Sequence, residues 1–460
     1  MPLSPEAKKR IQGKIPSKPK AEATDKTPSP PPPLPPSAKV YFNQAKANYM
    51  IQNHQGEWMG LTESSIGRVL RSMGFAGLKR DGSDLDDKER ELMRIQMEAN
   101  VHFAGEIAGY PVGPCQIGSH RVLITNEAKP LKPKEGKYPT LNTFLKELFG
   151  SQAAWVKGWL QSALISLKAG PPWRPGQLLA LAGPKGCGKS LFQNLVTEML
   201  GGRTARPWAY LTGESNFNSQ LLAAEHLIIE DEASSTDMRT RRHLGQMLKN
   251  MLVNQTQQLH AKGKDAITVT PFWRLTMSLN DEPDHLMCLP PMDESMKDKV
   301  ILVKCSPVTI PYAPEQIDER QKWGERLYAE LPAFLYALQR WPIPTLMRDV
   351  RFGIKAYQHE GLMNALDEIS PHMRLLNLID SLELIQFTAT HWQGTAHQLE
   401  NELREKDKNG EVARLLSYNT ACGQYLSMLA KRFPERFGFQ ERGGRLREWM
   451  IYREGTVREK

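Results

Sequence analysis

The feature that most constrains the fold of this chain is a glycine-rich octapeptide set between two partly apolar segments. It runs from Gly183 to Ser190 and reads Gly-Pro-Lys-Gly-Cys-Gly-Lys-Ser. Leu178–Ala182 in front of it is typical of a short buried strand, and residues 190–200 behind it are typical of a helix that ends at a Gly-Gly pair. A strand, a glycine-rich turn and a helix in this order predict an α/β core with a phosphate-binding loop.

The octapeptide matches the pattern G-x-x-x-x-G-K-[ST] at every fixed position. Its glycines allow backbone N–H groups to curl around phosphates, Lys189 can reach the β- and γ-phosphates, and Ser190 offers a hydroxyl to Mg²⁺. Cys187 stands at a variable position, to which the pattern assigns no role. We therefore expect ATP and Mg²⁺ as cofactors of a P-loop NTPase. The expected nucleotide-binding residues are Gly183, Pro184, Lys185, Gly186, Cys187, Gly188, Lys189 and Ser190.

Two further motifs supply the polar groups that hydrolysis needs. Residues 227–232 read Leu-Ile-Ile-Glu-Asp-Glu, which predicts a buried strand ending in acids. We expect Asp231 to order the Mg²⁺ shell together with Ser190, and Glu232 to polarise the attacking water. A frame shifted by one residue, Glu230 and Asp231, is the alternative. Asn280 follows another expected strand and can hold the water or contact the γ-phosphate, although Asn in this position also forms turns.

Composition adds only broad limits. The net charge is +9, from 60 basic and 51 acidic residues, which suits a polyanionic partner without establishing one. The five cysteines are scattered without a CxxC pair, which argues against a zinc site or a disulfide framework. No apolar stretch approaches the roughly 20 residues that span a bilayer, and the N-terminus lacks the apolar run of a signal peptide. These features predict a cytoplasmic protein.

Changes in sequence character divide the chain into five expected regions. Residues 1–38 read as a disordered, basic, proline-rich arm, either a nucleic-acid or partner contact or a solvated tail. Residues 40–150 read as a mixed accessory N-terminal domain, in which Thr62 begins a helical pattern. Residues 151–310 form the expected ATPase core, 311–374 a helical linker region, and 375–460 a winged-helix-like domain.

The winged-helix expectation rests on helices followed by a basic hairpin. One helix carries Leu399 and Leu403 on a face and a second runs through Tyr425, while residues 437–439 and 446–452 read as paired strands. Such a domain can bind a duplex or serve as a protein-binding module or spacer, and the sequence favours neither. Its clustered basic residues are Lys431, Arg432, Arg436, Arg442, Arg445 and Arg447.

The three motifs lie close together, within residues 183–280. Their order and spacing resemble those of the superfamily III helicases. These helicases are an AAA+ subgroup of replication proteins from small viruses, phages and mobile elements. From about Val40 to Tyr452 the chain resembles the phage and prophage primase–helicase proteins related to the poxvirus type. The segments that carry this wider resemblance are Phe217-Asn218, residues 289–293, Asp298-Lys299, residues 348–353 and residues 392–396. The resemblance implies an AAA+ core in a ring-shaped homo-hexameric DNA helicase with a C-terminal winged helix.

The same resemblance implies where DNA is held. The family has a basic β-hairpin between its second and third motifs that lines the channel of the ring, and this chain has His260, Lys262 and Lys264 at that place. We expect these three residues to contact the DNA backbone, although a hairpin tip can also be basic for solubility alone.

The chain departs from the family at the cationic finger that acts on the γ-phosphate. An arginine is usual there, whereas this chain has Lys299, with Lys297 nearby. Lysine can offset developing charge but lacks the planar fork of arginine. Either Lys299 serves as the finger, or an arginine reaches across a subunit boundary; the alternatives are Arg239, Arg241 and Arg242.

These features predict an ATP-dependent DNA helicase that acts in replication of a phage, prophage or mobile element. Residues 40–150 show no paired carboxylates in a primase pattern, so we expect a separate protein to supply any priming. Two alternatives stay open. One is an AAA+ ATPase that loads or remodels a protein–nucleic-acid complex, and the other is a DNA-binding replication initiator or repressor with little unwinding activity.

Overall fold

The computed structural model describes residues 39–79, 82, 84–230, 238–254, 256–259, 267–313, 315–382, 390–442 and 446–453. The chain divides into two compact units. The smaller comprises Met1–Val40 and Asn48–Ala99, and the larger comprises Tyr41–Ala47 and Asn100–Lys460. Within the described residues, no helix is both long and apolar enough to cross a membrane.

The smaller unit packs two helices beside an antiparallel strand pair. The helix expected after Thr62 is present, because the Thr62 side chain accepts a hydrogen bond from the Ser65 N–H and caps its first turn. Ile66 and Leu70 are buried on one face, and Gly74 follows the helix with a φ of 105°. The elements are β2 (Asn48–Gln52), β3 (Trp58–Leu61), α2 (Glu63–Ser72) and α3 (Asp87–Glu98).

The centre of the larger unit is a five-stranded sheet with the order β14-β8-β13-β10-β9, in which every described pairing is parallel. The strands β8 and β13 are buried along their whole length, as expected for apolar strands covered by helices on both faces. The strands are β8 (Leu178–Ala182), β9 (Thr204–Ala205), β10 (His226–Glu230), β13 (Arg274–Leu279) and β14 (Val300–Lys304). The structure therefore confirms a mixed α/β fold with a parallel sheet.

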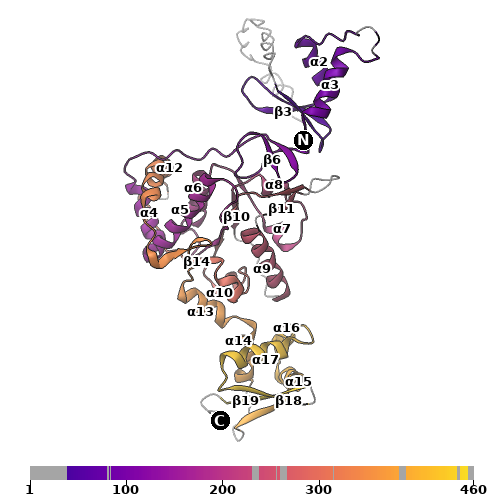
Figure 1. Cartoon of the computed structure of the whole chain (residues 1–460). Helices are drawn as coiled ribbons and strands as arrows, with labels where there is room; N and C mark the ends of the chain where they lie inside the picture. Colours follow the sequence, from indigo (N-terminus) through magenta and orange to yellow (C-terminus); the bar gives the residue numbers. More distant parts are fainter. Residues whose placement is uncertain are drawn as a thin grey trace, which may run out of the picture. The chain divides into compact units, whose positions relative to one another are not determined.

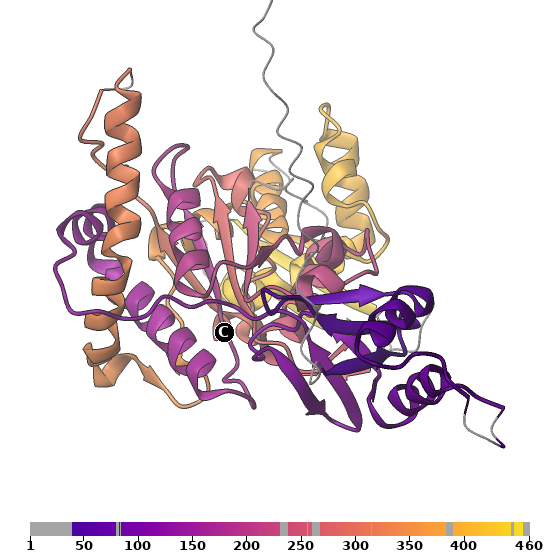
Figure 2. The same ribbon diagram turned by 90° about the horizontal axis from the view of Figure 1, so that it is seen from above.

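Helices surround this sheet and share its hydrophobic core. The long helix α12 (Ile317–Arg340) packs against α4 (Pro139–Phe149), α5 (Ala153–Ala169) and α6 (Lys189–Met199), and it is the long orange helix of Figure 2. Figure 1 shows α7 and α9 together away from that group. The remaining helices of this part are α7 (Trp208–Thr212), α8 (Ser219–Leu222), α9 (Met238–Val253), α10 (Pro283–Leu286), α11 (Glu294–Lys297) and α13 (Glu360–Glu368), with the short helices η1 (Gly150–Gln152) and η2 (Thr345–Met347).

Small sheets flank the central one. The three-stranded sheet β5-β7-β6 contributes Val122 and Ile124 to the same core as β8, so residues 100–150 group with residues 151–310 rather than with residues 48–99. Its strands are β5 (Phe103–Gly105), β6 (Gly113–Ile117) and β7 (His120–Ile124). The other pairs are β1 (Val40–Asn43) with β4 (Asn100–Val101), β11 (Gln257–Leu259) with β12 (Ile267–Val269), and β15 (Arg348–Asp349) with β16 (Gly353–Ile354).

The C-terminal part has a hydrophobic cluster of its own, which includes the buried Trp392 and Trp449. The hairpin expected from the sequence is present as β18 and β19, and a third strand, β17, which the sequence pattern does not predict, pairs with β19. The elements are α14 (Pro371–Ser381), β17 (His391–Thr395), α15 (Ala396–Lys406), α16 (Glu411–Leu415), α17 (Ala421–Arg432), β18 (Phe437–Arg442) and β19 (Leu446–Tyr452).

Candidate functional site

The glycine-rich loop joins the carboxyl end of β8 to the first turn of α6. Gly186 and Gly188 have φ angles of 77° and 112°, in the region that only glycine adopts without strain. Gly183 is required for another reason, because a Cβ atom there would lie 2.4 Å from the carbonyl oxygen of Cys305. Gly186 and Gly188 therefore allow the backbone of the loop to turn, and Gly183 allows the loop to lie close to Cys305, the residue that follows β14.

Lys189 occupies the centre of this loop. Its side chain is buried, and its ammonium donates to the carbonyl oxygens of Gly183 at 2.6 Å and Pro184 at 2.9 Å. No carboxylate of the described residues pairs with it. A buried cation whose hydrogen bonds go to two carbonyl oxygens, with a cysteine sulfur at 3.9 Å, favours an anion as its neighbour. Ser190 is exposed in the same turn, at the N-terminus of α6, where backbone N–H groups also attract anions.

Asn280 lies beside the loop. It directly follows β13, and the last residue of that strand, Leu279, is level with Ala182 of β8. The Gly183 N–H donates to the Leu279 carbonyl at 3.2 Å, so the loop and the end of β13 are hydrogen-bonded to each other. Asn280 itself is half-buried. The fold thus brings together two motifs that are far apart in the sequence.

The acidic motif follows β10, which ends at Glu230 on the same edge of the sheet. Glu230 is level with Ser278 of the neighbouring β13. Its carboxylate accepts a hydrogen bond from the Arg206 guanidinium at 2.8 Å. Arg206 follows β9, which pairs with β10 on the side that faces away from β13 and β8. Asp231 and Glu232 lie outside the described residues.

The three expected DNA contacts, His260, Lys262 and Lys264, also lie outside the described residues. The strands on either side of them, β11 and β12, pair antiparallel. Asn218 is buried and donates to the Gln258 carbonyl at 2.7 Å, which ties β11 to the start of α8.

The finger candidates differ in position and burial. Lys299 precedes β14 and therefore lies at the amino end of that strand, opposite the edge that carries the phosphate loop. Its ammonium donates to Asp298 at 2.6 Å and to the Ser295 carbonyl at 2.9 Å. Arg242 is exposed on α9, whereas Arg241 is buried. The side chain of Arg239 lies outside the described residues.

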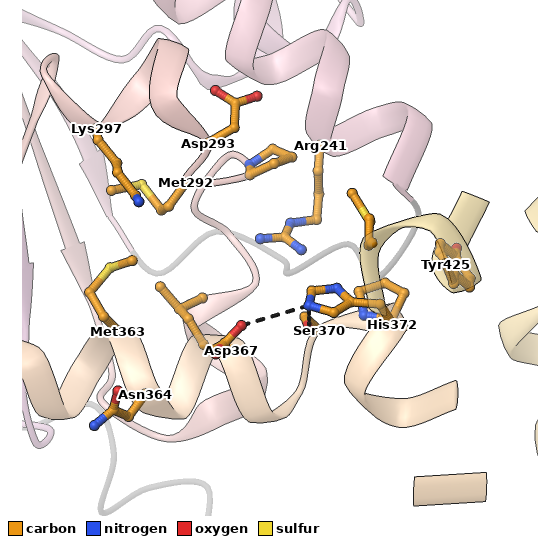
Figure 3. A pocket seen from close by; sticks show the side chains of 14 residues that line it. Arg241, Met292, Asp293, Lys297, Met363, Asn364, Asp367, Ser370, His372 and Tyr425 are labelled. Carbon is orange, nitrogen blue, oxygen red and sulfur yellow. Dashed lines mark hydrogen bonds and ion pairs between the residues drawn. The ribbon is translucent and has the colours of Figure 1, made fainter. Parts of the chain in front are cut away.

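Arg241 lines a cavity of about 380 Å³ that lies apart from the glycine-rich loop and is shown in Figure 3. Its Nε donates to the Leu289 carbonyl at 3.0 Å, and burial lowers the pKa of Arg241 to about 10. Across the cavity His372 pairs with Asp367 at 3.8 Å, and burial lowers the pKa of His372. None of the lining residues belongs to the phosphate loop. Arg241 therefore holds the segment that begins at Leu289 in this structure.

A buried polar network connects α6 to the strands beneath it. His226 of β10 is fully buried and contacts the hydroxyls of Thr197 at 2.7 Å and Thr276 at 2.9 Å, and Gln193 also donates to Thr276. Burial lowers the pKa of His226 to about 3, so the ring is neutral at physiological pH. The network fixes the helix that follows the phosphate loop onto β10 and β13.

Sequence reasoning missed the environment of Cys187. The thiol of Cys305, which follows β14, donates a hydrogen bond to Cys187, and the Lys189 ammonium lies 3.9 Å from the Cys187 sulfur. The hydrogen bond from Cys305 and the charge of Lys189 outweigh burial and lower the pKa of Cys187 to about 6. Only the parallel pairing of β14 with β8 brings the two cysteines together, so no local sequence pattern could have indicated it.

The fold and the site define a mixed α/β protein in which β8, a strand of the central parallel sheet, is followed by a glycine-rich loop around a buried lysine. A family model described as a family of unknown function (DUF5906) matches residues 181–295. That range includes the phosphate loop, the acidic motif and Asn280, but not Lys299. No curated relative matches the chain by sequence.

Solved structures with a similar fold exist. The apo structure of the C-terminal region of NrS-1 has a TM-score of 0.53 at 12% sequence identity, and the match covers 90% of this chain and 96% of that chain. The A form apo structure of the same region has a TM-score of 0.52 at 12% identity, with the same coverage. These similarities show a shared fold over most of the chain. A structure described as the active helicase SCCmec type IV Cch matches with a TM-score of only 0.29 at 10% identity. That match covers 86% of this chain and 73% of that chain.

Proposed function

We propose that this protein hydrolyses ATP with Mg²⁺ at the loop Gly183–Ser190. The observation that carries the proposal is the buried Lys189 ammonium, which has no carboxylate partner among the described residues and is enclosed by a glycine turn at a helix N-terminus. Gly186 faces open space, and Pro184 and Lys185 are exposed, so phosphates have access to the loop. The residues present thus fit a nucleoside triphosphate.

The proposed role of each residue in the site follows from the chemistry of its side chain. Lys189 binds the β- and γ-phosphates, and the Ser190 hydroxyl with the Asp231 carboxylate holds Mg²⁺. Glu232 orients the attacking water, and Asn280 beside the loop contacts that water or the γ-phosphate. The pairing of Glu230 with Arg206 turns the first acid of the motif towards β9, which favours Asp231 and Glu232 over the frame shifted by one residue.

We further propose that hydrolysis drives a DNA helicase of the superfamily III, AAA+ type, acting in replication of a phage, prophage or mobile element. The order and spacing of the three motifs support this. In this proposal the chain forms a homo-hexamer, and His260, Lys262 and Lys264 hold the DNA strand in the channel. The C-terminal helices and the sheet β17-β19-β18 act as a winged-helix-like domain.

The test compares strand displacement on forked DNA, with ATP and Mg²⁺, by the wild type, Lys189→Ala and Glu232→Gln. Lys168→Ala serves as the matched control, because that lysine is exposed on α5 away from the loop. We expect unwinding by the wild type and the control only, with nucleotide binding retained in Glu232→Gln and lost in Lys189→Ala. Hydrolysis that is indifferent to every DNA and gives no unwinding would favour the loader or remodeller instead. A wild type that binds no nucleotide would refute the proposal.

A further inference from the structure

Two cysteines from distant parts of the chain meet behind the phosphate loop. Cys187 belongs to the loop, and Cys305 is the first residue after β14, where its N–H donates to the Ala182 carbonyl at 2.6 Å. The exposed fractions of Cys187 and Cys305 are 3% and 1%, and their thiols are hydrogen-bonded to each other. Gly183 allows this approach, because a Cβ atom there would lie 2.8 Å from the Cys305 Cβ.

The surroundings make the two sulfurs unequal. Cys187 receives the Cys305 hydrogen bond and faces the Lys189 ammonium, which together lower the pKa of Cys187 to about 6. Cys305 donates that hydrogen bond and is buried, which raises its pKa well above the usual value. These two environments favour the thiolate at Cys187 and the protonated thiol at Cys305, an arrangement suited to thiol oxidation. The loop residues directly before Cys187, Pro184–Gly186, are exposed, so solvent and small oxidants reach the loop itself.

We propose that Cys187 and Cys305 form a peroxide-sensitive dithiol, and that its oxidation to a disulfide closes the phosphate loop to nucleotide. The effect on nucleotide rests on the proposed function, whereas formation of the disulfide does not.

The reaction uses hydrogen peroxide as the oxidant and proceeds in two steps. The Cys187 thiolate attacks one peroxide oxygen, so that an S–O bond forms, the O–O bond breaks and hydroxide leaves, giving a sulfenic acid. Cys305 then loses its proton, and its sulfur attacks the Cys187 sulfur. The S–S bond forms as the S–O bond breaks, and the second hydroxide leaves. With the two thiol protons, both hydroxides become water. Two thiols and one peroxide thus give one disulfide and two waters.

Closing the bond must displace the loop. Hydrogen-bonded thiols lie well beyond the roughly 2.05 Å of a disulfide bond, so closing the bond draws Cys187 and the loop that carries it towards β14. The loop N–H groups and Lys189 then lose the geometry that phosphates require. We expect nucleotide affinity to fall at least tenfold. Bound nucleotide should in turn protect the pair, because it covers the loop and draws Lys189 away from Cys187.

The experiment treats the full chain with a small excess of hydrogen peroxide, alkylates the remaining thiols and maps the peptides without reduction. We expect a cross-linked pair of peptides containing Cys187 and Cys305, slower formation of this pair in the presence of an ATP analogue, and weaker binding of a fluorescent ATP analogue that dithiothreitol restores. In Cys305→Ser, the oxidised Cys187 should form no cross-link.

Cys422→Ser is the matched control. Its thiol is also buried, but burial raises the pKa of Cys422 to about 12, so this variant should behave as the wild type does. Oxidation of Cys187 with no link to Cys305 would overturn the proposal, and so would a cross-linked protein that still binds nucleotide with unchanged affinity. If the reduced wild type binds no nucleotide, the proposed function fails, while the peptide map still decides whether the dithiol forms.

Discussion

Lowering the pH should destabilise this protein through one buried ring, His226. The structure holds it neutral between Thr197 and Thr276 with a pKa of about 3, whereas the unfolded chain has the ordinary value of 6.5. Between these values the unfolded state binds more protons than the native state, so the stability that His226 contributes is present above pH 6.5 and is lost as the pH falls. From pH 7.5 to pH 5.0 the loss amounts to about 2 kcal/mol, at 1.36 kcal/mol per pKa unit.

The assay is urea denaturation at both pH values for the wild type and for His226→Asn. The variant lowers stability at pH 7.5 by disturbing the network, but the informative quantity is the change between the two pH values. We expect the wild type to lose about 2 kcal/mol more than the variant over this range. Other groups, including His372, titrate in both proteins, and their contributions to the change in stability cancel in the comparison. Equal losses in the two proteins would refute the argument that His226 is buried and neutral.

The remaining predictions concern buried charge and catalysis. Glu225→Gln should lower the free energy of unfolding by about 3 kcal/mol, measured by urea denaturation, because the fully buried Glu225 is the close carboxylate partner of Arg203, whose other partner, Glu106, lies farther off at 3.7 Å. A loss under about 1 kcal/mol would contradict this. Asn280→Ala should lower the hydrolysis rate on the order of 10²-fold while ATP affinity stays within about twofold, and an equal loss of both would make Asn280 a structural residue. If Lys299 is the finger, Lys299→Ala should lower the hydrolysis rate on the order of 10³-fold without weakening nucleotide binding, and full activity of this variant would exclude Lys299 as the finger.

The parts that the sequence predicted well depend on local patterns. Leu178–Ala182 and the helix after it can be read from an apolar run, a glycine turn and a helical period, and the structure has both. The capped helix after Thr62 is a similar case. The strand β17 was missed because Trp392-Gln-Gly-Thr offers no clear alternation, and Gly394 weakens the strand pattern.

The parts that could not be predicted depend on which strands become neighbours. The parallel sheet places β13 between β8 and β10, and this order brings Asn280 beside Gly183. The network around His226 and the contact between Cys187 and Cys305 arise in the same way, from residues separated by long stretches of chain. Periodicity describes one segment at a time and carries no information about such pairings.

The position of Lys299 limits how the proposed enzyme can complete its site. All described pairings in the central sheet are parallel, so the phosphate loop lies at the carboxyl edge, while Lys299 lies at the amino end of β14. The five residues of β14 separate the two edges by roughly 16 Å, more than a lysine side chain can span. If Lys299 is the finger, it must therefore act on the site of a neighbouring copy. Mixing Lys299→Ala with Lys189→Ala should then restore part of the hydrolysis that each variant lacks alone, because some interfaces combine an intact loop with an intact Lys299. No restoration in mixed oligomers would leave the exposed Arg242 as the better candidate.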